Sequence, residues 1–248
     1  MTDRALYVAM TGASATLRAQ TSVSHNLANT DTVGFQATMS GTVAAPIDGE
    51  GHRTRVNAGF ENLGVSAARG QVMTTGGPLD VALHEGRWLA VQATDGTTAY
   101  TRAGNLQVTP NGLLTTRSGL PVLGADGAPV AVPPNDSISI ASDGTISIVP
   151  QGQPASTIAA AGTIGVFQAT QPQLVRGDDG LFRPAPGTAP ALATGPSLIP
   201  GALEGSNVEA TTALVSMIEL SRQFEMQVRV LHTSDENARS ANSLLSSR

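Results

Sequence analysis

The side chains that could do chemistry in this sequence are histidines and carboxylates. The chain contains no cysteine, which removes thiolate nucleophiles, cysteine metal ligands and disulfides. Its histidines are His25, His52, His84 and His232. None follows the H-x-x-x-H or H-E-x-x-H spacing that places two imidazoles on one metal ion. We therefore expect isolated surface or interface histidines and no metal site.

Carboxylates offer a second route to chemistry, through acid–base catalysis or calcium binding. Catalysis needs carboxylates that converge in a cleft, whereas the nearest candidates, Asp80, Glu85 and Asp95, are scattered and suit turn and surface roles. The Asp-Gly pairs lack the spacing and distal glutamate of a calcium loop. Residues 76–78, Gly-Gly-Pro, are too short and proline-bound to cradle phosphate. A secreted β-rich enzyme or carbohydrate-binding module remains only a remote alternative.

Composition excludes further classes of protein. The net charge is -5 without any basic run, so the electrostatic footprint of a nucleic-acid-binding protein is missing. Apolar residues make up 40% of the chain but aromatic ones only 3%, so the core must be light and can depend on neighbouring subunits. The sequence shows neither a Sec-type signal peptide nor an apolar run that could span a bilayer. These features predict a cytoplasmic location, unless export uses a non-cleaved route.

Helical periodicity occurs only at the two ends of the chain. Residues 3–29 carry apolar side chains near a 3.5-residue repeat, and residues 209–246 carry a heptad seam. Ser206 or Asn207 is a natural N-cap for the second helix. At ~1.5 Å per residue this helix would be about 57 Å long, too long for the β body to cover. The candidate subunit-interface residues on the two stripes are Leu6, Met10, Leu17, Leu27, Leu214, Met217, Phe224, Val228, Leu231 and Leu245.

Short strands and turns are expected between the helices. The strand candidates are Val65–Met73, Leu79–Leu83, Trp88–Ala93, Thr98–Arg102, Ser137–Ala141, Thr145–Val149 and Thr163–Ala169. Asp-Gly and Asn-Gly pairs between them favour hairpins, and no strand–helix–strand spacing points to a parallel sheet.

The predicted fold class is α+β, with long N- and C-terminal helices forming a coiled-coil-like domain and a central, mostly antiparallel β domain. Residues 1–35 would form the first helix and its exit motif, and residues 36–64 an extended connector. Residues 65–205 would form the β domain and residues 206–248 the last helix. A chain with its only long helices at its extremities is typical of a subunit that polymerises through its ends.

Two motifs lie beside these helices: residues 24–35, SHNLANTDTVGF, and residues 203–208, LEGSNV. They resemble the terminal signatures of the flagellar axial protein family (rod, hook and hook-associated subunits), roughly S-x-N-L-A-N-x-x-T-x-G-[FY] and L-E-x-S-N-V. His25 and Val33 stand where many members carry Asn and Thr. The matching residues are Asn26, Leu27, Ala28, Asn29, Gly34, Phe35, Leu203, Glu204, Ser206, Asn207 and Val208.

The middle of the chain agrees with this resemblance. Residues 75–83, TGGPLDVAL, are similar to the family's T-G-x-P-L-D-x-A-[IL], and residues 100–106, YTRAGNL, to its Y-T-R-x-G-x-[FL]. Length and the β body restrict the choice within the family to a proximal or a distal rod subunit. The opening residues 3–13 and the run 35–37 resemble the proximal one. A distal rod or hook-type subunit remains the alternative.

The resemblance implies a structural subunit of the bacterial flagellar rod, not an enzyme and without a cofactor. Its terminal helices would polymerise into the axial drive shaft, which transmits torque and surrounds the export channel, and their folding would be coupled to assembly. The implied partners are further copies, the other proximal and distal rod proteins and the flagellar type III export apparatus, with no nucleic acid and no membrane insertion. The implied location is the periplasmic rod of the basal body, reached without a cleaved signal peptide. Asn26 and Asn29 would tie the helix exit to the connector, with Gly34 allowing the turn and Phe35 anchoring it.

Overall fold

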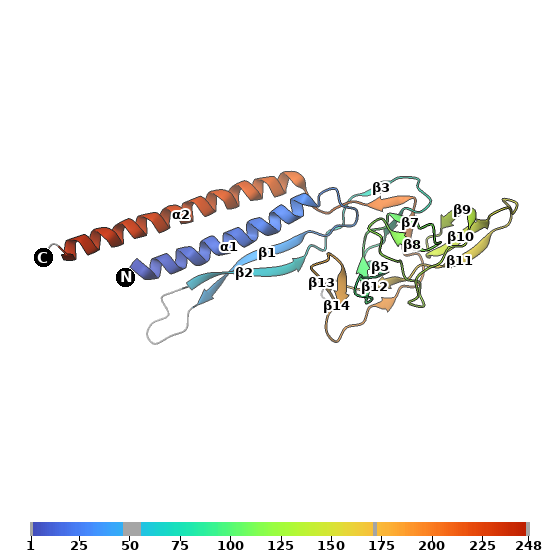
Figure 1. Cartoon of the computed structure of the whole chain (residues 1–248), viewed down its shortest axis with the longest axis horizontal. Coiled ribbons are helices and arrows are strands. Elements are labelled where there is room, and N and C mark those ends of the chain that lie inside the picture. The colour runs from blue at the N-terminus through green and yellow to red at the C-terminus, as the bar shows by residue number, and fades with distance from the viewer. Residues whose placement is uncertain (1, 47–55, 171–172, 247–248) are drawn as a thin grey trace. The chain divides into compact units, whose positions relative to one another are not determined.

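A computed structural model describes residues 2–46, 56–170 and 173–246 of the chain (Figure 1). The chain forms two compact units. The helical unit comprises Met1–Asn29, Thr38–Gly64 and Val208–Arg248, and the β unit comprises Thr30–Ala37 and Val65–Asn207.

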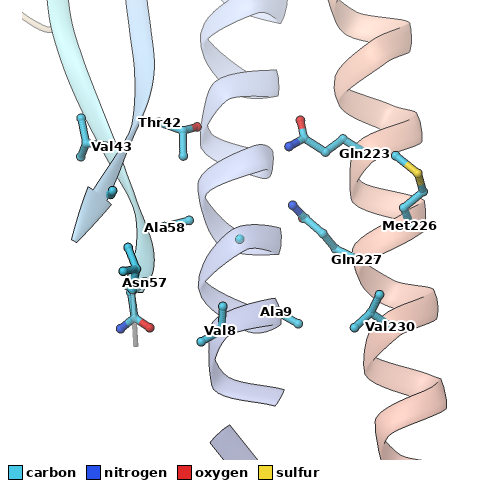
Figure 2. Close-up of a pocket in the computed structure, with 13 residues that line it drawn as sticks. Val8, Ala9, Thr42, Val43, Asn57, Ala58, Gln223, Met226, Gln227 and Val230 are labelled. Atoms are coloured by element: carbon cyan, nitrogen blue, oxygen red, sulfur yellow. The ribbon is translucent and has the colours of Figure 1, made fainter. Parts of the chain in front are cut away.

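The helical unit contains the two predicted helices. Helix α1 spans Thr2–Ala28 and helix α2 spans Ala210–Ser246. The segment expected to be an extended connector contains strands β1 (Thr38–Pro46) and β2 (Val56–Val65), which pair in a two-stranded sheet. Helix α1 packs against α2 on one side and against β1 on the other (Figure 2). The helical unit is therefore not a simple hairpin of two helices, because α1 also packs against a sheet.

The prediction that the terminal helices form a coiled-coil-like domain was wrong, although the α+β class and the mostly antiparallel β region are correct. A coiled coil buries large residues of both helices along one seam. In α1 the buried side chains are instead the small ones Ala13, Ala15 and Thr16, while the predicted seam residues Met10 and Leu17 are 49% and 47% exposed. The heptad spacing misled because α1 has two neighbours, a helix and a sheet, and small residues let both approach.

The start of α2 also differs from the expected N-cap. The first helical hydrogen bond runs from the N–H of Ala213 to the carbonyl of Glu209, which places Glu209 at the cap position. The Glu209 carboxylate accepts hydrogen bonds from the hydroxyls of Thr211 (3.1 Å) and Thr212 (2.8 Å). Asn207 is used elsewhere, as described below.

The β unit is built from short strands, and every pairing described within it is antiparallel. Its largest sheet has six strands in the order β13-β14-β6-β5-β12-β15, and a separate sheet has the order β11-β10-β9. Three two-stranded pairs, β16-β4, β17-β3 and β7-β8, complete it. The strands are β3 (Val72–Thr74), β4 (Val81–Leu83), β5 (Arg87–Gln92), β6 (Thr98–Thr101), β7 (Leu106–Val108), β8 (Leu114–Thr116), β9 (Asn135–Ile140), β10 (Thr145–Pro150), β11 (Ala159–Thr163), β12 (Val166–Gln168), β13 (Leu174–Arg176), β14 (Phe182–Pro184), β15 (Ala191–Leu192), β16 (Leu198–Pro200) and β17 (Ala202–Glu204).

Two of the expected strands are divided. In the candidate Val65–Met73, strand β3 begins only at Val72. Residues 66–71 before it form hydrogen bonds with the terminal motifs instead. The candidate Thr163–Ala169 divides between β11 and β12 near Gly165, whose N–H donates to the carbonyl of Leu123 (2.8 Å).

The core of the β unit is aliphatic, as the low aromatic content predicts. One cluster is centred on fully buried residues such as Val81, Leu89 and Ile146. A second cluster gathers aromatic side chains, with the ring centres of Trp88 and Phe182 4.6 Å apart. Val81 lies in β4, and Trp88 and Leu89 lie in β5, the two strands that also bond to the terminal motifs through Arg102.

Candidate functional site

The two terminal motifs meet in the β unit, although they lie at opposite ends of the sequence. The backbone N–H of Gly34 donates to the carbonyl of Glu204 at 2.7 Å, and the N–H of Asn207 donates to the carbonyl of Phe35 at 3.2 Å. We call residues 34–37 together with residues 204–207 the root clamp. Beyond it the chain passes into the helical unit, toward β1 on one side and α2 on the other.

The side chain of Asn207 makes four hydrogen bonds in the root clamp. Its Oδ1 accepts a hydrogen bond from the N–H of Ala37 at 2.6 Å. Its Nδ2 donates to the carbonyls of Ala68 (2.8 Å) and Ser66 (3.4 Å) and to Oε1 of Gln36 (3.2 Å). One amide thus ties three separate chain segments together, a role that the sequence-based N-cap hypothesis did not foresee.

Glu204 of the root clamp is completely buried. Its carboxylate accepts hydrogen bonds from Nε of Arg102 (3.0 Å), from Nη2 of the same side chain and from the N–H of Gly70 (3.3 Å). A second guanidinium, that of Arg69, lies 3.9 Å away. Ionised side chains are almost never fully buried unless they are paired, and here the pair joins two motifs that are separated along the chain.

Arg102 connects this ion pair to the core strands. Its Nη1 donates to the carbonyl of Arg87 (2.9 Å) and its Nη2 to the carbonyl of Leu83 (3.3 Å). Its guanidinium carbon lies 5.5 Å from the centre of the Trp88 ring, close enough for a cation–π interaction. In the sequence, Arg102 belonged to the Y-T-R motif and to a strand candidate, but neither assigned it a partner. The sequence signal that could have indicated the Arg102–Glu204 pair is a charged residue within an apolar strand region.

Two glycines are required where the root clamp touches other backbone. Gly34 has φ +69°, which confirms the expected turn, and a Cβ added there would overlap the backbone of Arg102 and Ala103. A Cβ added at Gly70 would overlap the carbonyl of Gly205. A larger residue at Gly34 must displace residues 34–37 from Arg102 and Ala103, and one at Gly70 must displace Gly205.

Phe35 is 6% exposed, and a cation covers it. The guanidinium carbon of Arg176 lies 4.5 Å from the centre of the Phe35 ring. Nη1 of Arg176 also donates to the carbonyl of Gln36 at 3.0 Å. Burial lowers the pKa of the Arg176 guanidinium from its ordinary value, and the ring face and the carbonyl offset part of that desolvation.

Asn26 and Asn29 act at the end of α1, in the helical unit. The Asn26 amide makes a reciprocal pair with Thr38, donating to its carbonyl (2.8 Å) and accepting from its N–H (2.9 Å). This agrees with the expected tie between the helix exit and the following segment. Nδ2 of Asn29, the residue after α1, donates to the carbonyl of His25 at 2.8 Å.

The predicted subunit-interface residues fall into two groups. Leu6, Leu27, Met217, Phe224, Val228 and Leu231 are half-buried within the chain. Met10, Leu17 and Leu214 are exposed, and the side chain of Leu245 lies outside the described part of the structure. Among the described side chains of the two helices, the other large apolar residues that are exposed, which the sequence stripes missed, are Tyr7, Val215, Ile218, Met226 and Val230.

A groove of about 930 Å³ runs along the helical unit, with α1 between the β1–β2 sheet and α2 (Figure 2). Val8, Ala9 and Gly12 of α1 line it. The other lining residues, from β1, β2 and α2, are Thr42, Val43, Ala44, Val56, Asn57, Ala58, Gln223, Met226, Gln227 and Val230. All the groove residues that the structure describes are uncharged, so the groove suits an apolar partner better than an ionic one.

Two of the three candidate catalytic carboxylates, Asp80 and Asp95, are hydrogen-bonded by nearby threonines. The Asp80 carboxylate accepts a hydrogen bond from the hydroxyl of Thr75 at 2.6 Å. The hydrogen bond from the Thr97 hydroxyl is the main cause of the lowered pKa of exposed Asp95, with the Thr97 N–H and Arg183 contributing. Within residues 2–46, 56–170 and 173–246, no cluster of three or more histidines, aspartates or glutamates is arranged to hold a metal ion.

None of the helices in the described ranges is long and apolar enough to cross a membrane.

Family comparisons cover both ends and the middle of the chain. Residues 6–36 match the family model described as "Flagella basal body rod protein", residues 85–148 match "Flagellar hook protein FlgE/F/G D1 domain", and residues 199–244 match "Flagellar basal body rod FlgEFG protein C-terminal". The first match includes residues 34–36 of the root clamp, and the last includes residues 204–207.

Individual relatives align over almost the whole chain. The chain is 44% identical over 250 residues to the flagellar basal-body rod protein FlgF of Escherichia coli, covering 98% of this chain and 99% of that protein. It is 44% identical over 253 residues to FlgF of Salmonella typhimurium, with the same coverage of 98% and 99%. It is 33% identical over 240 residues to the rod protein FlgG of Bacillus subtilis, covering 86% of this chain and 88% of that protein.

Proposed function

The chain belongs to the flagellar basal-body rod protein family and is a structural subunit of the rod, and we propose that it polymerises through the exposed faces of its two terminal helices. It assembles with other flagellar rod subunits and is not an enzyme. The identity of 44% to two FlgF proteins over nearly the full chain supports an FlgF-like, proximal place in the rod. An FlgG-like place in the distal rod is the alternative.

One observation carries the proposed mode of assembly: each terminal helix has an apolar face that nothing in the described chain covers. On α1 the face contains Tyr7 (65% exposed), Met10 and Leu17, whose spacing of three and seven residues puts them on one side of a helix. A contiguous apolar patch on a free subunit is unfavourable in water and marks an interaction site. Neighbouring subunits would cover it.

The corresponding face of α2 lies opposite the half-buried one. Val215, Ile218, Met226 and Val230 are between 51% and 59% exposed, and their spacing of three, eight and four residues follows one side of the helix. Met226 and Val230 also line the groove, so the uncovered face and the groove are continuous. Covering them would contribute about 25 cal/mol for each Å² of apolar surface removed from water.

The path and place of the subunit are part of the same proposal. An FlgF-like subunit would be exported by the flagellar type III apparatus without a cleaved signal peptide. It would then join the periplasmic section of the rod, which transmits torque and surrounds the export channel. The similarity to FlgF proteins supports this path.

A charge placed on the uncovered face of α2 tests the proposal. We expect Ile218→Glu to abolish swimming in the source bacterium, because a carboxylate would have to be desolvated between subunits. Thermal unfolding of the purified variant should match that of the parent chain, since Ile218 is 56% exposed in the subunit. The matched control is Ile158→Glu, at a β-unit position that is 71% exposed, and it should swim. Normal swimming of Ile218→Glu would contradict assembly through this face.

A further inference from the structure

We propose that the root clamp is already folded in the unassembled subunit, as part of the β unit, and that Asn207 acts there as a positioning residue for both terminal helices. The clamp would hold the chain segments that lead into α1 and α2 together before any neighbour binds. The second half of this inference rests on the proposed function, whereas the first half concerns the free subunit alone.

The bonds that hold the clamp come from the β unit and not from the helices. Glu204 is held by Arg102, which is bonded in turn to the carbonyls of Leu83 in β4 and Arg87 in β5. Asn207 is held by the carbonyl of Ala68. Removing every helix contact would therefore leave these bonds in place, so the clamp should be as ordered as the strands that support it.

The approaches of backbone to backbone reinforce this. Gly34 and Gly70 each lie so close to another chain segment that a Cβ would overlap it. Such contacts form only when both segments are in their final positions. The clamp is thus an all-or-none arrangement, and partial docking of residues 34–37 would leave the N–H groups of Gly34 and Ala37 without their partners.

A preformed clamp has a consequence for assembly. Two helices with uncovered apolar faces would be expected to wander independently if only long flexible chains joined them to the β unit. Joining their roots raises the effective concentration of one helix near the other. Neighbouring subunits would then meet a pre-arranged pair of helices and would have less ordering entropy to overcome.

Asn207 is the residue at which this can be tested without disturbing the core. It is half-buried and its side chain bonds to Ala37, Gln36, Ser66 and Ala68. Truncation by Asn207→Ala removes these bonds but keeps the Arg102–Glu204 pair. The matched control is Asn135→Ala, in the same unit, whose side chain donates to the carbonyl of Pro133 at 2.9 Å.

Hydrogen exchange on the free, full-length protein provides the first readout. In the parent chain, the amides of Gly34 and Ala37 should exchange as slowly as those of β5 and β6, and more slowly than those of α1 and α2. In Asn207→Ala the exchange of the Ala37 amide should accelerate by about tenfold or more, because its acceptor on Asn207 is removed, while β5 and β6 stay unchanged. Asn135→Ala should leave residues 34–37 protected. Exchange of residues 34–37 at the rate of the helices in the parent chain would overturn the preformed clamp.

Swimming of the source bacterium provides the second readout. If Asn207 only stabilised the β unit, a variant with unchanged thermal stability would still swim. Asn207→Ala should abolish swimming although the thermal midpoint of the β unit is unchanged, and Asn135→Ala should swim. Normal swimming with a loosened clamp would overturn the positioning role. If the clamp is protected as expected but Ile218→Glu swims normally, the preformed clamp stands and assembly through the α2 face fails, so the two claims can be separated.

Discussion

At the scale of single residues, the main feature of the root clamp is a buried ion pair. Arg102 and Glu204 are 4% and 0% exposed and join motifs about one hundred residues apart. A buried pair contributes little net stability compared with apolar residues of the same volume, because both charges lose their hydration. Its value here is specificity: Glu204 can settle only where Arg102 and the N–H of Gly70 meet it.

This argument predicts different outcomes for single and double substitutions of the pair. Glu204→Ala should lower the free energy of unfolding by about 3–5 kcal/mol, because Arg102 is left buried without a counter-charge. The double variant Arg102→Met with Glu204→Leu should recover most of that loss. Urea unfolding of the parent chain, Arg102→Met, Glu204→Leu and the double variant measures the coupling. A double variant as unstable as the sum of its single variants would contradict the ion-pair account.

At the scale of elements, the segment from α1 to β1 depends on one glycine. Gly34 combines φ +69° with direct contact to the backbone of Arg102 and Ala103. The structure therefore places the turn after α1 inside the β unit, where it packs on the chain that follows β6. The sequence motif identified Gly34 as a turn residue, but its contact with Arg102 depends on a distant part of the chain.

Gly34→Val should detach residues 34–37 from the clamp, abolish swimming and leave the strands of the β unit folded. The left-handed backbone alone costs a residue with a Cβ roughly 1–2 kcal/mol, and the overlap with Arg102 adds to that. Gly119→Val is the matched control, since Gly119 has φ +86° and nothing within 4 Å of an added Cβ. Gly119→Val therefore carries the same cost of a left-handed backbone as Gly34→Val, without the overlap with other backbone. A strain with Gly119→Val should swim. Circular dichroism checks the fold of both variants, and a swimming Gly34→Val strain would refute the account.

The elements that could be predicted from the sequence are those with local, periodic signals. The ranges of α1 and α2 and of strands β4, β5, β6, β9 and β10 agree with the apolar spacing and the turn residues of the sequence, including the alternation of Ser137–Ile140 in β9. The other strands have no such local signal. Strands β1 and β2 lie in a segment without clear alternation, and β1 packs against α1, which lies outside that segment. Asn207 was expected to cap a helix because local sequence cannot reveal acceptors that lie about 140 residues away.

Local sequence also could not predict which face of each helix packs within the subunit. The heptad seam of α2 identified Met217, Phe224 and Val228, which are half-buried within the chain. Residues one or two positions away from seam residues, such as Val215 and Ile218, form the uncovered face. Both faces are apolar, so spacing alone could not distinguish the face that packs within the subunit from the one that remains free.

At the scale of the whole molecule, the two units have different tasks. The β unit has a closed aliphatic core and holds the root clamp. The helical unit has small buried residues, a groove and uncovered apolar faces on both helices. A subunit of this kind is complete only among neighbours, as expected for a family of rod proteins.

Photo-crosslinking in assembled basal bodies tests this central claim most directly. A benzophenone amino acid would replace Met226, on the uncovered face of α2, or Val175, a β-unit residue of similar exposure (59% and 55%). The account predicts that ultraviolet light joins the Met226 probe to another rod subunit in isolated basal bodies, whereas the free subunit gives no such product. The Val175 probe should give far less. Assembled rods in which the Met226 probe yields no subunit adduct while the Val175 probe does would contradict assembly through the terminal helices.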